Sequence, residues 1–220
     1  MAGEHGLGDE AVLRLAVLLE ALADPEAPTT VHAPSEGVDV HLADSLAGLM
    51  VPALREALQI ADLGSGAGLP GLALAVARPE ASVTCVESAG RKAAFISDAA
   101  SAMGLANVAV RPVRVEEWTG ARCDVVCARA LAPLAVLVEY AAPVLRLGGS
   151  LVAWKGAVSE EEASAGSAAA SLVGLAARPP VQVRPFPAAR HRWLHVFEKV
   201  SETPSRYPRR PGMAVKRPLG

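Results

Sequence analysis

A cluster of glycines at residues 64–71 constrains the fold of this chain more than any other feature. The run Gly64-Ser-Gly-Ala-Gly-Leu-Pro-Gly71 holds four glycines in eight residues and follows the short apolar stretch Ile60–Leu63. A predicted helix, Leu72–Ala77, comes directly after it. Glycine at a strand-to-helix turn permits positive φ angles and lets the backbone approach a ligand closely. The segment therefore predicts a ligand-binding loop in an α/β fold, with a turn that binds no ligand as the alternative.

The rest of the chain alternates between predicted strands and predicted helices. Strands are expected at Ser82–Val86, Val108–Val113, Asp124–Ala128 and Gly148–Trp154, helices at Arg91–Met103, Leu134–Leu145 and Ser159–Ala177, and a closing strand pair at Val181–Val183 and Leu194–Lys199. Such alternation indicates βαβ units. This layout is typical of the class I methyltransferase fold, a Rossmann-like α/β fold. We expect a seven-stranded, mostly parallel sheet with helices on both faces; an ordinary doubly wound domain is the alternative.

Two helices are expected before the sheet. Asp9–Ala23 and Leu42–Leu58 have apolar residues at helical spacing, and Pro25–Gly37, with three prolines, is expected to be a loop. We expect residues 1–58 to form a small N-terminal helical cap, residues 59–200 the Rossmann-like core and residues 201–220 a basic tail. With 220 residues, of which 51% are apolar, the chain fits one compact domain.

The distribution of charge indicates a polyanionic partner. Residues 178–220 contain ten Lys and Arg against two Glu, a local charge of +8. Since the whole chain has a net charge of −2, the other 177 residues carry −10. This asymmetry suggests a segment that faces nucleic acid on an otherwise acidic protein, and a solvated tail without a partner is the alternative.

We expect a cytoplasmic protein that binds neither membrane nor metal. Uncharged apolar stretches such as Ala130–Val138 fall short of the roughly 18–20 residues of a membrane-spanning helix. Met1–Glu10 lacks the basic region of a signal peptide. Cys85, Cys123 and Cys127 lie in apolar runs, and their spacing without a paired His does not suit zinc.

The glycine loop allows two cofactors, and charge distinguishes them. Gly66, Gly68 and Gly71 also form the Gly-x-Gly-x-x-Gly pattern of dinucleotide-binding proteins, which is weak evidence alone. A carboxylate at Asp62 would repel a pyrophosphate, which prefers bare amides at a helix N-terminus. S-adenosylmethionine carries an ammonium and a sulfonium and has no phosphate. We therefore predict S-adenosylmethionine rather than a nicotinamide cofactor, with Asp62, Gly64 and Gly66 among the residues that bind it.

Acidic residues after the next two strands fit a nucleoside. Glu87 ends a predicted strand, where a carboxylate can accept hydrogen bonds from both ribose hydroxyls. Val115 and Glu116 follow the third strand, and residues at this place line the adenine in this architecture. The alternatives are a surface position for Glu87 and an exposed helix start for the Val115–Glu116 pair.

Four stretches resemble the RsmG (GidB) family, the methyltransferases that modify guanine N7 in 16S ribosomal RNA. They are His41–Leu46, the Asp62–Gly71 loop with its Leu-Pro-Gly ending, the pair Val115–Glu117 and Ala128–Ala130, and the tail Glu198–Leu219 with its Tyr-Pro-Arg-Arg segment. The Leu-Pro-Gly ending and the basic tail are more specific than the glycine loop. The N-terminal region departs from the family, because Pro28–Val31 stands where members usually carry Asn-Leu-Thr.

The resemblance implies transfer of a methyl group from S-adenosylmethionine to N7 of a guanine in the 530 loop. It implies 16S ribosomal RNA or the small ribosomal subunit as partner, and we expect a monomer. It places cofactor contacts at Gly64, Leu69, Val115, Glu116 and Arg129. From the family layout Arg129 could pair with the cofactor carboxylate or an RNA phosphate, and capping of the strand end is the alternative.

Guanine N7 has an in-plane lone pair, so its methylation needs alignment rather than a general base. We therefore expect no catalytic triad; His41 and Asp44, three residues apart on one helical face, are the candidates for shaping the target pocket, with helix capping as the alternative. The expected RNA-binding residues are Lys155 and, in a tail expected to be extended, Arg206, Arg209, Arg210, Lys216 and Arg217. Methylation of another RNA or a small molecule, and RNA binding without catalysis, are the alternative functions.

Overall fold

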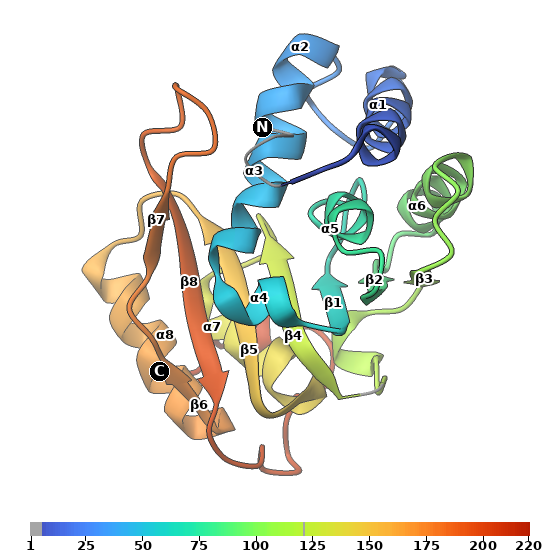
Figure 1. The fold of residues 1–220 in the computed structure, drawn as a ribbon. Helices are drawn as coiled ribbons and strands as arrows, with labels where there is room; N and C mark the ends of the chain where they lie inside the picture. Colours follow the sequence, from blue (N-terminus) through green and yellow to red (C-terminus); the bar gives the residue numbers. More distant parts are fainter. Residues whose placement is uncertain (1–5, 121) are drawn as a thin grey trace.

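The computed structural model describes residues 6–120 and 122–220, which form an eight-stranded sheet (Figure 1). The strand order is β3-β2-β1-β4-β5-β8-β6, and β7 pairs with β8. Strands β1 to β5 run parallel, and β8 is antiparallel to β5, β6 and β7. The strands are β1 Gln59–Leu63, β2 Ser82–Val86, β3 Val108–Arg111, β4 Cys123–Arg129, β5 Leu145–Lys155, β6 Leu175–Ala177, β7 Val181–Val183 and β8 Arg192–Lys199. The expected class I methyltransferase architecture is confirmed, with one strand more than the seven predicted.

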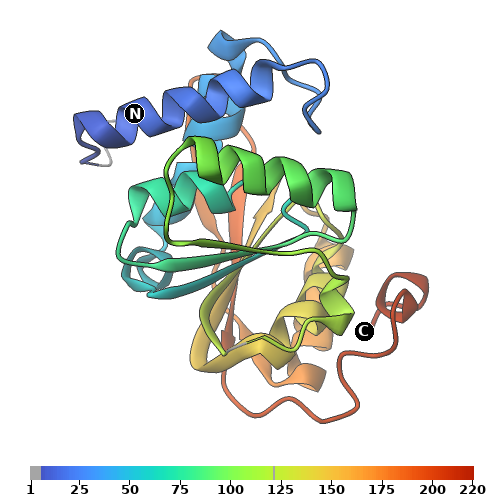
Figure 2. The ribbon, with the colours of Figure 1, turned by 90° about the vertical axis from the view of Figure 1, so that its right-hand side faces the viewer.

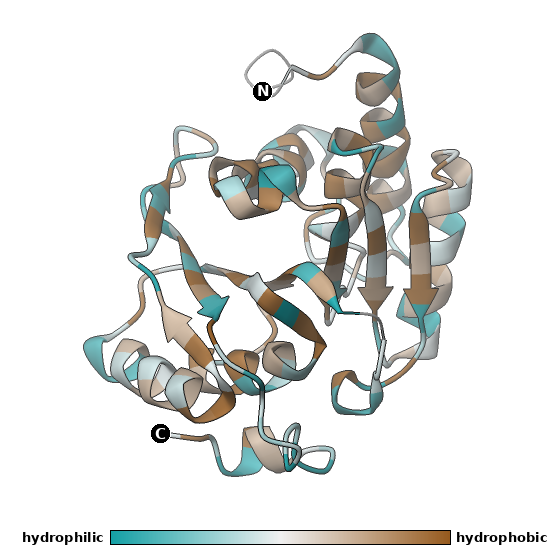
Figure 3. Ribbon diagram, turned by 60° about the horizontal axis from the view of Figure 1, so that its bottom comes forward, coloured by the Kyte–Doolittle hydropathy of each residue, from teal (hydrophilic) through white to brown (hydrophobic). Residues whose placement is uncertain are grey.

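Helices cover both faces of the sheet (Figure 2). One face carries α1 (Asp9–Ala23), α5 (Gly71–Ala77) and α6 (Gly90–Ala102), and the other carries α7 (Leu134–Ala141) and α8 (Glu160–Val173). Because successive strand residues point to opposite faces, the apolar strands feed two cores. In β4, Val125 packs in the core beneath α5, and its neighbour Val126 packs in the core against α7. Burial on both faces explains why four apolar residues follow one another at Val125–Ala128 of β4. In Figure 3 brown, apolar bands occupy much of the strands and are interrupted by paler or teal bands.

The first N-terminal helix, α1, has the predicted bounds Asp9–Ala23, whereas the second begins earlier than predicted. A helical run extends from Pro34 to Met50 through α2 (Pro34–Gly37), a π-helical stretch (Val38–Ala43), α3 (Asp44–Leu46) and a 3-10 turn (Ala47–Met50). Proline fits the first turn of a helix, where its missing N–H would have no partner, so Pro34 starts this run and Pro52 starts α4 (Pro52–Glu56). The expected loop at residues 25–37 is therefore shorter, and the expected helix Leu42–Leu58 is interrupted at Val51.

The predicted helix Ser159–Ala177 is wrong at its end. Helix α8 begins after Ser159, whose Oγ accepts a hydrogen bond from the Glu162 N–H at 3.2 Å. It ends at Gly174, which has a φ of +84°, the left-handed conformation that closes many helices. The chain then reverses into β6, the additional strand, whose Leu175 is buried in the core.

Smaller differences concern the ends of other elements. The predicted strand Val108–Val113 stops at Arg111, before Pro112, which cannot donate to a ladder. The predicted helix Leu134–Leu145 ends at Ala141, and β5 begins at Leu145. The tail was expected to be extended, but it contains the one-turn helix α9 (Met213–Lys216). No helix of the described chain is both long enough and apolar enough to cross a membrane.

Candidate functional site

A cavity of about 510 Å³ opens at the carboxyl ends of β1, β2 and β4. Strand β1 lies between β2 and β4 in the sheet, and the connections after β1 and β4 leave toward opposite faces, to α5 and α7. A crevice forms at such a point because neighbouring loops diverge, and ligands of open α/β sheets bind there. The predicted residues Gly64, Gly66, Leu69, Glu87 and Arg129 line this cavity, and so do Val115 and Glu116.

The loop after β1 requires glycine at its predicted positions. Gly64, Gly66 and Gly68 have φ angles of +64°, +59° and +84°, which other residues adopt at a cost. The N–H of Gly64 donates to the Val86 carbonyl at 2.8 Å, so the loop is fixed to the end of β2. A Cβ on Gly64 would lie 2.4 Å from Leu131 Cδ1. The loop therefore brings bare backbone to the cavity wall.

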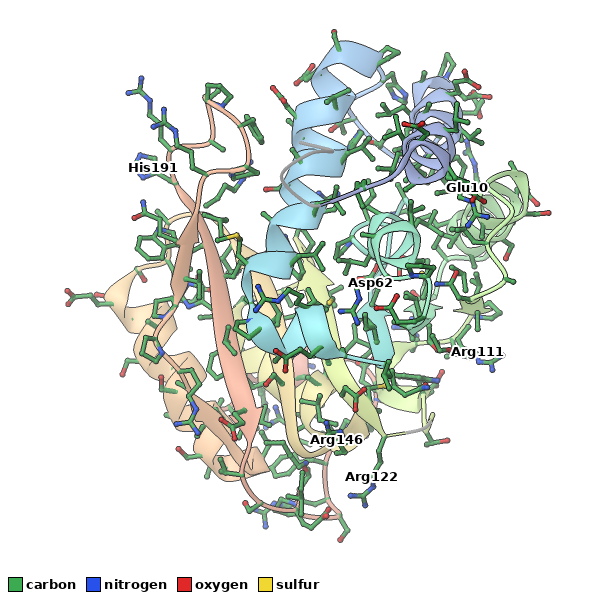
Figure 4. The ribbon with its side chains drawn as sticks, viewed as in Figure 1. Glu10, Asp62, Arg111, Arg122, Arg146 and His191 are labelled. Atoms are coloured by element: carbon green, nitrogen blue, oxygen red, sulfur yellow. The ribbon has the colours of Figure 1, made fainter. Side chains whose placement is uncertain are left out.

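Asp62 lies beneath this loop, between β1 and α5 (Figure 4), and is not among the residues that line the cavity. Its Oδ2 accepts a hydrogen bond from the Gly71 N–H at 3.0 Å, which holds the start of α5. Its Oδ1 is buried without a hydrogen-bond partner among the described residues. Burial raises the pKa of Asp62 to about 7. Its expected contact with the cofactor stays a prediction. In this structure its carboxylate binds the end of the glycine loop through the Gly71 N–H.

Glu87 binds the glycine loop from the end of β2. Its Oε2 accepts a hydrogen bond from the Gly66 N–H at 3.0 Å, and its Oε1 accepts one from the Ala89 N–H at 2.8 Å. Glu87 lines the cavity, and its predicted contact with ribose hydroxyls stays a prediction. It therefore joins the glycine loop to the segment that leads from β2 into α6.

The opposite wall contains Glu116, in the turn Val115–Glu117. Its Oε1 accepts hydrogen bonds from the Tyr140 hydroxyl at 3.1 Å and from the Gly212 N–H at 2.8 Å. Burial, together with the charge of Glu116, raises the pKa of Tyr140. Gly212 and Val215 also line the cavity. The C-terminal tail is therefore part of this wall.

An ion pair fixes the tail to α7. Glu139 is fully buried, and Arg209 contacts both of its oxygens, with Nη2–Oε2 at 2.6 Å and Nε–Oε1 at 2.9 Å. The Arg209 N–H also donates to Glu139 Oε1, at 2.9 Å. RNA contact by Arg209 stays a prediction, and in this structure its guanidinium has a partner within the chain.

A second cavity, of about 590 Å³, adjoins the first. Thr29, His41, Arg129 and Ala130 line both. Ala130 has a φ of +52°, an unfavourable value for a residue with a side chain, as is common where backbone is held in place at functional sites. The shared wall means that a molecule in one cavity lies beside a molecule in the other.

Asp44 organises the second cavity. Its Oδ2 lies 3.1 Å from Arg129 Nη1, and its Oδ1 lies 3.2 Å from Arg192 Nε. The Trp154 indole N–H donates to its backbone carbonyl at 2.8 Å. Asp44 is buried, so the two guanidinium groups compensate the cost of burying its charge. Lys155 also lines this cavity, and its Nζ lies 2.7 Å from Glu162 Oε1.

His41 lines both cavities, and its environment disfavours the charged imidazolium. Its Nε2 lies 2.9 Å from the Val31 carbonyl, so this nitrogen carries the proton. The Nδ1 lone pair is buried and has no hydrogen-bond partner among the described residues. Burial lowers the pKa of His41, and the charge of Arg129 lowers it further. The shared wall thus holds an unpaired nitrogen without a positive charge.

The other tail cations lie on the surface. Arg206 stacks over the Tyr207 ring at 5.1 Å from its centroid. Arg210, Lys216 and Arg217 are exposed and line a shallow hollow of about 500 Å³. Their geometry suits contact with an anionic partner, and their RNA contacts stay predictions.

Thr29, Tyr140 and Arg192 are among the cavity residues that were missed in the sequence. Thr29 and Arg192 lie far from the glycine loop in the sequence, and only the fold brings Thr29 to the first cavity and both residues to the second. Tyr140 had a visible signal, because it and Glu139 are the only polar residues in the apolar helix α7. No group of three or more His, Cys, Asp or Glu that could hold a metal ion occurs within residues 6–120 and 122–220.

Comparison with known proteins adds the family. Residues 13–182 match the model of GidB, described as rRNA small subunit methyltransferase G. A protein of that name from Rubrobacter xylanophilus is 42% identical over 187 residues, which cover 81% of this chain and 72% of the relative. Another, from Deinococcus radiodurans, is 40% identical and covers 96% and 85%. Fibrillarin from Aeropyrum pernix, solved with bound S-adenosyl-L-methionine, has the same fold at 20% identity and a TM-score of 0.55, covering 70% of this chain and 72% of that one.

Proposed function

The chain belongs to the rRNA small subunit methyltransferase G family, and we propose that it transfers the methyl group of S-adenosylmethionine to N7 of a guanine in the 530 loop of 16S ribosomal RNA. The observation that carries this proposal is the pair of adjoining cavities at the carboxyl edge of the sheet. One cavity would hold the methyl donor and the other the acceptor base. Their shared wall puts the two reactants side by side.

The residues of the first cavity fit S-adenosylmethionine. Glu87 offers carboxylate oxygens at the end of β2, suited to the ribose hydroxyls of an adenosine. The Oε2 of Glu116 accepts no hydrogen bond from the described residues, so it is available to an amino group. Arg129 can pair with a carboxylate. When bound, the cofactor supplies an activated methyl group on a sulfonium.

The residues of the second cavity fit a base that is methylated without loss of a proton. N7 of guanine needs only to be aligned with the methyl carbon and the sulfur at near-attack distance. His41 and Arg129 lie on the shared wall, and Asp44 holds Arg129 in place at 3.1 Å. The methylated base is cationic, and the lowered pKa of His41 disfavours a second positive charge on a wall that already carries Arg129. We propose that these residues position the base for methyl transfer and that none of them acts as a general base.

The test is transfer of labelled methyl groups to small ribosomal subunits from cells that lack the enzyme, with the modified base mapped. We expect label at guanine N7 in the 530 loop, and none when the Glu87→Ala variant, which removes the carboxylate that binds the loop, replaces the wild type. Binding of S-adenosylmethionine without labelling of either subunits or stripped 16S RNA would overturn the proposed acceptor. Binding of RNA with no affinity for the cofactor would overturn the catalytic role altogether.

A further inference from the structure

We propose that the C-terminal tail completes the cofactor cavity, and that Arg209 is a positioning residue for cofactor binding rather than an RNA contact. This inference rests on the proposed function only in that the first cavity binds S-adenosylmethionine. Three consecutive features of the tail carry it. They are the Arg209–Glu139 ion pair, the contact between Gly212 and Glu116, and the position of Val215 at the cavity.

The first feature anchors the tail firmly. A fully buried carboxylate is costly unless it is paired and hydrogen-bonded, and Glu139 is satisfied only by Arg209 among the described residues. The planar guanidinium fork matches the two carboxylate oxygens, which makes the pair directional as well as strong. Release of the tail would leave Glu139 buried and charged without a partner. The ion pair therefore favours the position in which the tail lies against α7.

The second feature, the contact between Gly212 and Glu116, links the ion pair to the cavity. Only two residues, Arg210 and Pro211, separate Arg209 from Gly212, so the ion pair limits where the Gly212 N–H can lie. Gly212 has a φ of +79°, and its N–H donates to Glu116 Oε1 at 2.8 Å. Glu116 is the carboxylate proposed to face the adenine. Its orientation thus depends on a hydrogen bond from the tail.

The third feature is an apolar side chain that the protein itself leaves uncovered. Val215 is 60% exposed although it belongs to a helix whose Ala214 is buried in the core. Val215 lines the cofactor cavity. An apolar side chain facing a cavity is covered when a ligand with an aromatic ring occupies it. The tail therefore contributes both a polar and an apolar contact to the site.

Two adjacent arginines allow a matched test. Arg209 is half-buried in the ion pair, whereas Arg210 is exposed and lines the hollow on the outer side of the tail. We would measure the dissociation constant of S-adenosylmethionine by calorimetry for the wild type and for Arg209→Ala, Arg209→Lys and Arg210→Ala. We expect about tenfold weaker binding for Arg209→Ala, a partial recovery for Arg209→Lys, and a change of less than about twofold for Arg210→Ala.

Limited trypsin digestion gives a readout that does not depend on activity. Without cofactor, Arg209→Ala should expose the tail to trypsin cleavage after Arg206 and Lys216 faster than the wild type, and saturating S-adenosylmethionine should protect the wild-type tail. If Arg209→Ala does not fold, Val215→Ser tests the same wall at an exposed position, with about threefold weaker binding expected. Equal cofactor affinity in the wild type, Arg209→Ala and Val215→Ser would overturn the inference. Absence of binding by the wild type would instead overturn the proposed function.

Discussion

Asp62 is a buried carboxylate with one oxygen hydrogen-bonded and the other without a partner among the described residues. Its pKa of about 7 lies above the ordinary value of 3.8, so between these pH values the folded protein binds more protons than the unfolded chain. The free energy of unfolding therefore falls as the pH rises through this window. Asparagine has nearly the same shape and does not titrate. Relative to the wild type, Asp62→Asn should gain about 2–3 kcal/mol of stability between pH 5 and pH 8.

Urea unfolding of the ligand-free proteins at pH 5 and pH 8 measures this difference. Asp98→Asn, on the exposed side of α6, is the control and should follow the wild type at both pH values. Identical pH dependence of the wild type and Asp62→Asn would mean that Asp62 stays ionised in the folded protein, and that its unpartnered oxygen is hydrated.

At this scale the sequence predicted the residues that follow strand ends. Gly64, Glu87 and Arg129 line the first cavity because the carboxyl ends of parallel strands meet at one edge. Side chains that reach the site through long-range contacts could not be predicted. Arg192 pairs with Asp44 across 148 residues, and no local pattern encodes such a contact. Arg209 illustrates the converse, since a basic run cannot indicate which of its members is paired inside the fold.

At the scale of the elements, the helical run from Pro34 to Met50 packs closely against Trp154 of strand β5 at Gly48. A Cβ on Gly48 would lie 2.3 Å from Trp154 Cζ2 and 2.7 Å from Leu54 Cδ2. Trp154 also donates to the Asp44 carbonyl, so it cannot move away without disturbing the second cavity. We expect Gly48→Ala to lower the free energy of unfolding by about 1–3 kcal/mol through overpacking.

Gly90→Ala is the matched control for this substitution. Gly90 begins α6, and a Cβ there would meet no atom within 4 Å. Alanine in a helix is favoured over glycine, so this variant should be neutral or more stable by up to about 1 kcal/mol. Thermal or urea unfolding of both variants measures the contrast. Equal stability of Gly48→Ala and the wild type would mean that the N-terminal helices shift freely on the sheet.

The elements themselves were predictable to different degrees. The strands β1, β2 and β4 follow from short apolar runs buried on both faces, and their predicted centres are confirmed. Strand β6 was missed because Leu175–Ala177 continues the alanine-rich composition of α8, and only the left-handed Gly174 separates them. A glycine in an otherwise helical stretch is ambiguous, since its φ angle depends on whether the following residues find a strand to pair with.

At the scale of the whole molecule, a second group of positive charges lies in the β7–β8 hairpin, on the side of the second cavity and away from the tail. The β7–β8 hairpin, residues 184–191, lies beyond the carboxyl end of β5, because Lys155 is paired with Trp193 at the start of β8 (Figure 1). Arg184 and Arg190 are exposed and line a hollow of about 520 Å³, and His191 lies on the same loop (Figure 4). From residue 163 to residue 197 the sequence has no acidic residue to offset them.

If the acceptor is RNA, this hairpin lies where the strand on either side of the target base must pass. Each phosphate contact that is lost reduces the slope of log affinity against log salt by about 0.7–0.9. The double variant Arg184→Ala/Arg190→Ala should therefore reduce the slope for a 530-loop RNA by about 1.5 and leave the cofactor affinity unchanged. The control, Arg55→Ala/Arg122→Ala, removes two exposed charges that precede β1 and β4, at the amino ends of these strands. Arg122 loses only an exposed ion pair, with Glu202 at 3.0 Å. Because the amino ends of the strands are remote from both cavities, the control should keep the wild-type slope. Equal slopes in the wild type, the double variant and the control would mean that the hairpin does not contact the RNA.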